Sequence, residues 1–151
     1  MPAAFAGGGN GVVGGTYNNA CPTPLVALSP ESCHWWDHLR RAGFVSGTGG
    51  LQPFNALTGL IGVQTGDGAG AATLLNVAGG NGFTGLIMCS ANLPDKIAIA
   101  MDTQMDDGAS NLGTVRALLQ AAPNPNIGAG QVATAAYAET GTNTYTLCRS
   151  L

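Results

Sequence analysis

Charged side chains are scarce in this 151-residue sequence. Asp, Glu, Lys and Arg together make up 9% of the chain, and the formal net charge is −3 at pH 7. The five basic residues are scattered, so no basic patch could follow a phosphate backbone and we expect no nucleic-acid partner. Glycine is abundant instead, at 24 positions. A surface of small uncharged residues repels its neighbours weakly, which favours lateral assembly about as much as it favours a neutral secreted domain.

Long apolar runs and the common enzyme motifs are missing as well. No apolar run approaches the roughly 20 residues that span a bilayer, and residues 1–15 carry no basic segment of a signal peptide. No serine stands in a G-x-S-x-G motif, and the glycine-rich segments lack the Gly-Lys-Ser/Thr of a P-loop. The sequence also offers no convincing acid–base pair. We therefore predict no catalytic residue, no cofactor-binding residue and no enzymatic activity.

None of the four cysteines stands in the CxxC spacing of zinc knuckles or thioredoxin-like proteins. An even number of cysteines in a lysine-poor chain fits two disulfides in an oxidising compartment. Of the three possible pairings we favour Cys21 with Cys33, which closes a short proline-rich loop, and Cys89 with Cys148, which fixes the C-terminal strand to the central region. Each bond would stabilise the fold by about 3 to 4 kcal/mol by restricting the unfolded chain.

The first predicted helix covers residues 30–42. Ser29 and Pro30 are typical of a helix start, and Gly43 is typical of a helix end. Phe44 and Val45 are then expected to pack back onto the helix. Its apolar face would contain Cys33, Trp36, Leu39 and Ala42.

A second helix is predicted in the segment that follows Cys89. Asn92 can cap it, Asp95 suits its positive end, and Gly108 would end it. Apolar residues recur every four positions, which predicts that they share the face that packs on the sheet. This face contains Leu93, Ile97, Met101 and Met105.

The remaining regular structure is predicted to be β-strand. Residues 1–29 are expected to form an irregular arm, because glycine, asparagine and proline punctuate them. Strands and helices do not alternate regularly, which favours one α+β domain over 1–151, with an antiparallel sheet, short helices and long glycine-rich loops. The predicted strands are 57–64, 73–77, 83–89, 112–119, 131–139 and 142–149, the last two as a hairpin.

Three carboxylates at the end of the second helix form a candidate metal site. Asp102 and Asp106 share a helix face and Asp107 follows at its end, so hard oxygen ligands for calcium would come together there. Acidic groups at a helix C-terminus oppose the helix dipole and require compensation. A calcium ion or an ion pair with Arg116 would supply it, and both interpretations stay open.

Two histidines, His34 and His38, are four residues apart and share a face of the first helix. This spacing could hold zinc or copper, and a metal-dependent hydrolase would be built on it. The glutamate that follows the first histidine in zincin-type proteases is absent, however. A polar helix face opposite Trp36 and Leu39 is the simpler interpretation.

Several segments taken together resemble one family. The patterns W-x-x-L-x-x-A-G-hydrophobic and L/M-D-D-G-x-x-x-x-G-x-V-R are fairly specific in combination. The chain resembles the globular part of bacterial type IV pilin-like proteins, which are subunits of pili and of type II secretion pseudopili. The segments that carry this resemblance are MPAAFAGGGNGVV, ESCHWWDHLRRAGFVSG, GLIMCSANLPDKIAIAMDTQMDDGASNLGTVRA and YTLCRSL.

The resemblance implies a structural role as a filament subunit. Its partners would be other pilin subunits in a homo-oligomeric filament on the cell surface, in adhesion or type II secretion. Such subunits carry a long N-terminal helix that anchors them in the inner membrane and then forms the filament core. That helix is absent from this sequence, so Met1 is expected to be an internal position, after a truncated helix or one encoded as a separate chain. In relatives calcium can bind pseudopilin loops, but no ligand set matches here residue by residue.

A missing helix predicts a sheet face that is open or filled by a partner. The alternative function is a secreted surface- or carbohydrate-binding module that presents Trp35 and Trp36, and it predicts that both indoles are exposed. The apolar positions expected on the open face are Leu60, Val63, Leu86, Met88, Val115 and Leu147.

Overall fold

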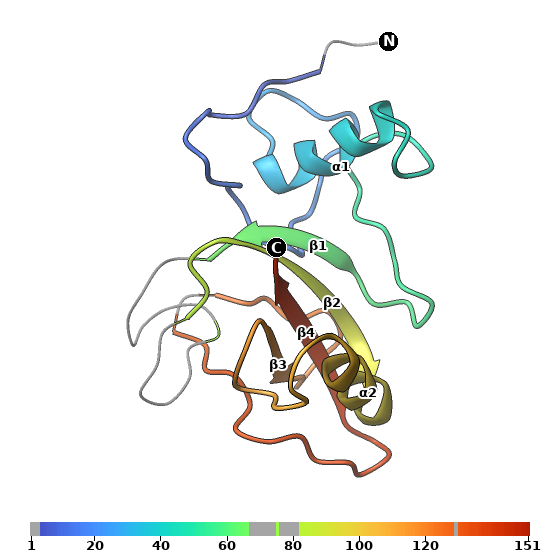
Figure 1. Cartoon of the computed structure of the whole chain (residues 1–151). Coiled ribbons are helices and arrows are strands. Elements are labelled where there is room, and N and C mark those ends of the chain that lie inside the picture. The colour runs from blue at the N-terminus through green and yellow to red at the C-terminus, as the bar shows by residue number, and fades with distance from the viewer. Residues whose placement is uncertain (1–3, 67–74, 76–81, 129) are drawn as a thin grey trace.

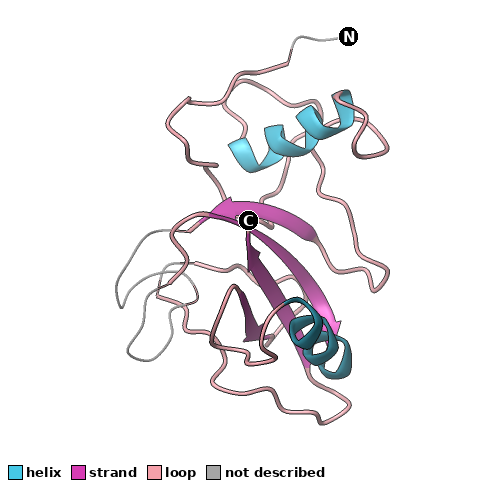
Figure 2. Cartoon of the chain, viewed as in Figure 1, coloured by secondary structure: helices cyan, strands magenta, loops and turns pink. Residues whose placement is uncertain are grey.

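Residues 4–66, 75, 82–128 and 130–151 are described by the computed structural model of this chain. They form two helices and a four-stranded antiparallel sheet (Figure 1), joined by long loops (Figure 2). The predicted α+β class with an antiparallel sheet is therefore confirmed. In chain order the elements are α1 (Glu31–Arg41), β1 (Ile61–Thr65), β2 (Leu86–Pro94), α2 (Asp95–Met105), β3 (Val115–Leu119) and β4 (Thr144–Ser150).

The sheet has the strand order β1-β2-β4-β3. The two longest strands, β2 and β4, lie in its centre, with Cys89 directly opposite Cys148. Of the predicted strand at 73–77, only Leu75 is among the described residues. Strands occur, with shifted ends, where 57–64, 83–89, 112–119 and 142–149 were predicted.

The predicted strand at 131–139, and with it the closing hairpin, is wrong. Both edges of β4 are already paired, with β2 on one side and β3 on the other, so β4 cannot pair with this segment. The segment instead crosses the outer edge of β3 as a loop. Thr134 donates its N–H to the carbonyl of Ala117, and its hydroxyl accepts the N–H of Leu119. These bonds satisfy the edge of β3 without a further strand.

Helix α1 lies beside β1, at one edge of the sheet (Figure 1). Its end is the predicted one: Gly43 has φ +81°, and the N–H groups of Gly43 and Phe44 bond to the carbonyls of Arg40 and Leu39. Two predictions about its flanks are wrong. The Ser29 hydroxyl accepts the N–H of Val26 instead of capping the helix, and the Phe44 side chain is 80% exposed because only its backbone returns to the helix.

The start of α2 also differs from the prediction. Asn92 belongs to β2, where its φ is +56°, and its side chain oxygen accepts the N–H of Asn124 and the amide of Gln120. It therefore fixes a neighbouring loop at an irregular point of the strand instead of capping a helix. The helix ends at Met105, before the predicted stop at Gly108.

The face of α2 that packs on the sheet is rotated from the predicted apolar stripe. Asp95, Ala98 and Asp102 are its buried residues, whereas Ile97 and Met105 are exposed. The helix can bury two carboxylates because loop N–H groups and a tyrosine hydroxyl bond to them. Periodicity alone could not reveal these donors, which lie far along the chain.

Each face of the sheet has its own core cluster. One face packs against loop residues, with the cluster Tyr17, Leu75, Phe83, Ile87, Cys89, Ala91, Ile127, Ala133 and Cys148. The other packs against α2, with the cluster Leu93, Ala98, Val115, Ala117, Tyr145 and Leu147.

The six positions expected on an open face are mostly covered. The strand register places five of them on the α2 side of the sheet, and Leu60 packs against the opposite cluster. On the α2 side Val63, Val115 and Leu147 are buried by this chain itself, so the expectation is wrong for them. Only Leu86 and Met88, both on β2, remain half-buried on that face.

Candidate functional site

The structure brings the three predicted metal-ligand candidates together. Carboxylate oxygens of Asp102, Asp106 and Asp107 lie within 4.8 Å of one another after the last turn of α2. Asp102 is fully buried, Asp106 is half-buried and Asp107 is exposed. Among the described residues this is the one group of three or more acidic, histidine or cysteine side chains at that spacing.

Each of these carboxylates already accepts hydrogen bonds from the protein. Asp102 accepts the Tyr137 hydroxyl at 2.6 Å and the N–H of Gly108 at 3.2 Å. Asp106 accepts the N–H groups of Thr114 and Val115, and so fixes the start of β3. Asp107 accepts the N–H of Ala109 at 2.8 Å. The cluster therefore builds the corner between α2 and β3.

The buried carboxylate at the centre of this corner has a perturbed acidity. Burial raises the pKa of Asp102, while its bonds from Tyr137 and Gly108 oppose the rise. Burial also raises the pKa of the Tyr137 hydroxyl, and the adjacent Asp102 raises it further. The hydroxyl therefore acts only as a donor to Asp102 across the neutral pH range.

The acidic cluster fits calcium only in the type of its ligands, which are carboxylate oxygens. Calcium takes six to eight oxygen ligands, and the three carboxylates are already oriented by protein donors. A calcium site at Asp102, Asp106 and Asp107 stays a prediction. Arg116, the other candidate for compensation, donates to the carbonyls of Leu75 and Gly113 and lies 4.5 Å from the centre of the Phe83 ring. Burial lowers the pKa of Arg116, and the negative charge of Asp106 opposes this lowering.

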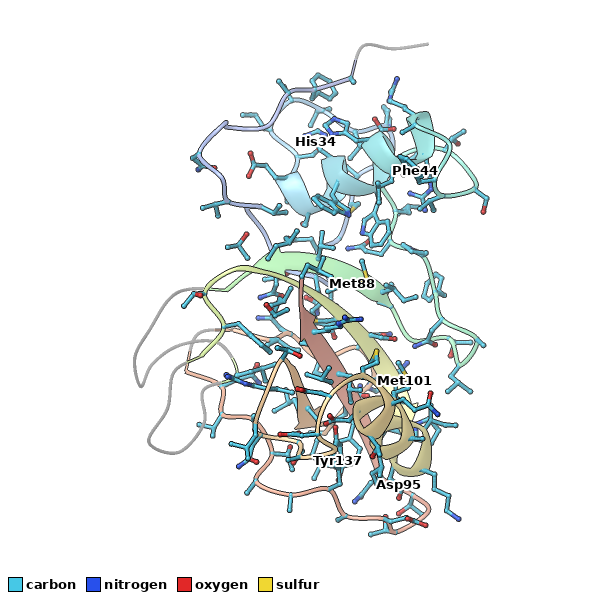
Figure 3. All side chains as sticks on the ribbon, in the orientation of Figure 1. His34, Phe44, Met88, Asp95, Met101 and Tyr137 are labelled. Atoms are coloured by element: carbon cyan, nitrogen blue, oxygen red, sulfur yellow. A yellow bond between two sulfur atoms is a disulfide. The ribbon has the colours of Figure 1, made fainter. Side chains whose placement is uncertain are left out.

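His34 and His38 lie on the same side of α1, with ring centroids 6.3 Å apart. His34 is 3% exposed, and its ring faces the N-terminal arm (Figure 3). His38 is exposed, and its Nε2 lies 2.8 Å from the carbonyl oxygen of Phe5. Both histidines line a cavity of about 250 Å³ beneath the glycine-rich part of the arm.

The two tryptophans do not present a double indole surface. Trp36 is buried in α1, and Trp35 is half-buried at the cavity beside His34. Neither indole Nε1 is accessible, and neither has a hydrogen-bond partner. Exposure of both indole rings would have favoured a surface- or carbohydrate-binding module. The structure does not show this exposure.

Two disulfides join distant parts of the chain, in the pairing favoured from the sequence. Cys21–Cys33 fastens the arm to α1, and Cys89–Cys148 joins the central strands β2 and β4. Disulfides persist in oxidising surroundings, so the pair indicates a compartment outside the cytosol. No helix in the described part of the chain is long and apolar enough to cross a membrane.

Sequence reasoning missed the role of one buried acid, Asp95. Its carboxylate is 2% exposed and accepts the N–H groups of Thr140, Gly141 and Lys96. These bonds, the one from Gly141 first, lower the pKa of Asp95. Its place after Pro94 indicated a helix start, but nothing local indicated a loop 45 residues away.

A second cavity, of about 500 Å³, was also not foreseen. Its walls come from three separate loops and from α1, at Pro24, Leu25, Asp37, Arg40 and Gly49 among others. Arg40 closes part of the wall by donating to the carbonyls of Ser46 and Gly49. Because its lining is assembled from separate segments of the chain, no sequence pattern marks it.

Comparison of this chain with protein-family models, with curated proteins and with solved structures finds no match. The fold and the contacts described above therefore carry the functional argument.

Proposed function

We propose that this chain is the globular part of a structural subunit of a type IV pilin-like filament at the cell surface, which packs laterally against copies of itself. The observation that carries the proposal is a set of large apolar side chains left in solvent in the segments that precede and follow α1 in the chain. Leu28 is 95% exposed and Phe44 is 80% exposed. The others in these two segments are Val26, Leu51, Phe54 and Leu57.

These exposed side chains support assembly on energetic grounds. Burying apolar surface contributes roughly 25 cal/mol per Å², so a full Leu or Phe side chain contributes about 1.5 to 3 kcal/mol when a neighbour covers it. Exposed apolar side chains mark protein–protein contact where they form a contiguous patch. With charged residues at 9% of the chain, little electrostatic repulsion opposes a lateral neighbour.

Two further observations are compatible with a filament subunit. The disulfides indicate an oxidising compartment, as the cell surface is. Leu86 and Met88 remain half-buried on the α2 side of the sheet, where the pilin resemblance implies contact with an N-terminal helix. That helix, in the full-length protein or as a separate chain, is the second partner in this proposal.

Immunogold electron microscopy of cells that produce the protein tests the filament role. Antibodies against the folded domain should label thin surface filaments along their length, and deletion of the gene should remove the label. Label spread evenly over the envelope, or protein found only as soluble monomer in the medium, would contradict the proposal and favour a secreted binding module.

A pair of variants tests the surface around α1. Phe44→Ser removes an exposed apolar side chain from this segment and should reduce the number of filaments while leaving the domain folded. Ile97→Ser, on the exposed side of α2, is the matched control and should leave the filaments unchanged. Equal effects of the two variants would show that the segments flanking α1 are not the contact surface.

A further inference from the structure

The cavity between α1 and the arm is lined by three ionisable side chains of one helix face. Glu31, His34 and His38 stand at positions i, i+3 and i+7, which places them on the same side of α1. The opposite wall is the backbone of residues 7–13, which is mostly glycine. Small residues there leave room for a bound group, and the volume of about 250 Å³ is below that of a pocket for a drug-sized ligand.

The hydrogen bond of His38 determines which of its two ring nitrogens carries the hydrogen. A carbonyl oxygen only accepts, so the Nε2 that lies 2.8 Å from the Phe5 carbonyl must carry the hydrogen. In the neutral ring the lone pair is then on Nδ1. A histidine that binds a metal almost always donates its other ring N–H to a carbonyl or carboxylate in this way.

His34 lacks the partners that a buried imidazole normally has. It is 3% exposed, and neither Nδ1 nor Nε2 makes a hydrogen bond. Buried polar groups in native proteins are nearly always paired, because an unpaired one loses its hydration without compensation. A ligand in the cavity would supply the missing partner, and a metal ion would use the lone pair of one ring nitrogen.

The charge around the two rings favours a cation. The Glu31 carboxylate accepts the N–H groups of Gly8 and Gly14, which attaches the arm to α1, and its negative charge acts on His34. No ion pair between Glu31 and a basic side chain occurs in the described residues. The cavity therefore combines two imidazoles with a carboxylate that pairs with backbone N–H groups and with no basic side chain among the described residues.

We propose that His34 and His38 together bind one divalent transition-metal ion, with Zn²⁺ as the reference ion and water in the remaining positions. Imidazoles one helical turn apart can converge on one ion, and imidazole nitrogen suits zinc, copper and nickel rather than calcium. This site is separate from the cluster of Asp102, Asp106 and Asp107, whose oxygen ligands suit calcium.

Calorimetric titration of the untagged chain with ZnCl₂ tests the proposal, and CaCl₂ is the matched control ion. We expect one saturable zinc site and no effect of calcium on it. His38→Gln should weaken zinc binding by about tenfold or more. His38 is exposed, so this variant should keep the fold, which circular dichroism checks. Asp107→Asn, in the acidic cluster, should bind zinc as the unmodified chain does.

Nitrogen-15 NMR of the imidazoles tests the ligands without replacing the buried His34. Zinc should shift one ring nitrogen of His34 and the Nδ1 of His38 together, with the Nε2–H of His38 retained. The absence of saturable zinc binding, equal affinity in His38→Gln, or imidazole nitrogens that zinc leaves unshifted would each overturn the proposal and leave water as the content of the cavity.

Discussion

At the scale of single residues, two aspartates on the same face of α2 differ in how the fold treats them. Asp95 accepts three backbone N–H groups, and its pKa is lowered. Asp102 accepts one hydroxyl and one N–H, and burial raises its pKa. The backbone donors thus favour the charged form of Asp95, whereas burial penalises the charged form of Asp102 more than its two donors favour it. Both residues connect α2 to the loop before β4 through hydrogen bonds.

The lowered pKa of Asp95 predicts a loss of stability in acid. The unfolded chain binds a proton at Asp95 more readily than the folded chain does, so folding is favoured above the ordinary pKa of 3.8. This contribution should be lost as the pH falls through the lower pKa of the folded state. Melting temperatures measured from pH 6 to pH 2 should fall less steeply for Asp95→Asn, which does not titrate. Parallel curves for the two proteins would contradict this assignment.

The bond between Tyr137 and Asp102 predicts a cost for removing the hydroxyl. Tyr137→Phe keeps the ring, which packs edge-on against Tyr145, but leaves the buried carboxylate with one partner fewer. We expect the free energy of unfolding to fall by about 1 to 3 kcal/mol, measured by denaturant titration. The Asp102→Asn variant completes a double-mutant cycle, in which purely additive effects would show that the two groups are not coupled.

At the scale of elements, local signals predicted the parts of the fold that depend on neighbours in the sequence. Helix α1 follows from its periodicity and its end from Gly43, and the alternation of Val115, Arg116 and Ala117 in β3 follows from the strand period. The orientation of α2 could not be predicted from local signals, because its buried acids accept hydrogen bonds from the loop before β4.

The same limit applies to the candidate sites. The acidic cluster was predictable because its members lie within six residues of one another on one helix and its end. The environment of His34 was not predictable, because the arm that covers it comes from residues far outside the helix. Spacing could place the two histidines on one face, but only the fold reveals that one of them is buried without a partner.

The two disulfides should differ in their contribution to stability. Cys89–Cys148 closes a loop of 59 residues and Cys21–Cys33 one of 12. Restriction of the unfolded chain then predicts about 4 kcal/mol for the first bond and about 3 kcal/mol for the second. Denaturant unfolding of the double variants Cys89→Ala/Cys148→Ala and Cys21→Ala/Cys33→Ala measures both values. A larger loss for the shorter loop would contradict the chain-entropy account.

At the scale of the whole molecule, the chain combines a four-stranded sheet with an irregular region around α1. Cys89–Cys148 joins the two central strands, β2 and β4, and both faces of the sheet carry a core cluster. The described part of the arm, residues 4–30, contains neither helix nor strand, and Cys21–Cys33, Glu31 and the buried Tyr17 attach it to the rest of the fold. Assembly through the exposed apolar side chains of the segments that flank α1 would therefore use the part of the chain with less regular structure.

The disulfides also define how the domain would respond to mechanical force. The covalent path between the two ends bypasses residues 22–32 and 90–147, because the two bonds bridge them. Force spectroscopy should therefore release about 200 Å more contour length after Cys89–Cys148 is reduced, and about 40 Å more after Cys21–Cys33 is reduced. Equal extension in oxidised and reduced protein would contradict this.

Under tension, then, the covalent path between the two ends does not run through α2, β3 or the loop before β4. They lie inside the longer bypassed loop, together with the corner built by Asp102, Asp106 and Asp107. The load passes instead through α1, β1 and the first residues of β2. A chain built in this way would yield first around α1, while the surface formed by α2 and β3 keeps its shape as the rest of the chain extends.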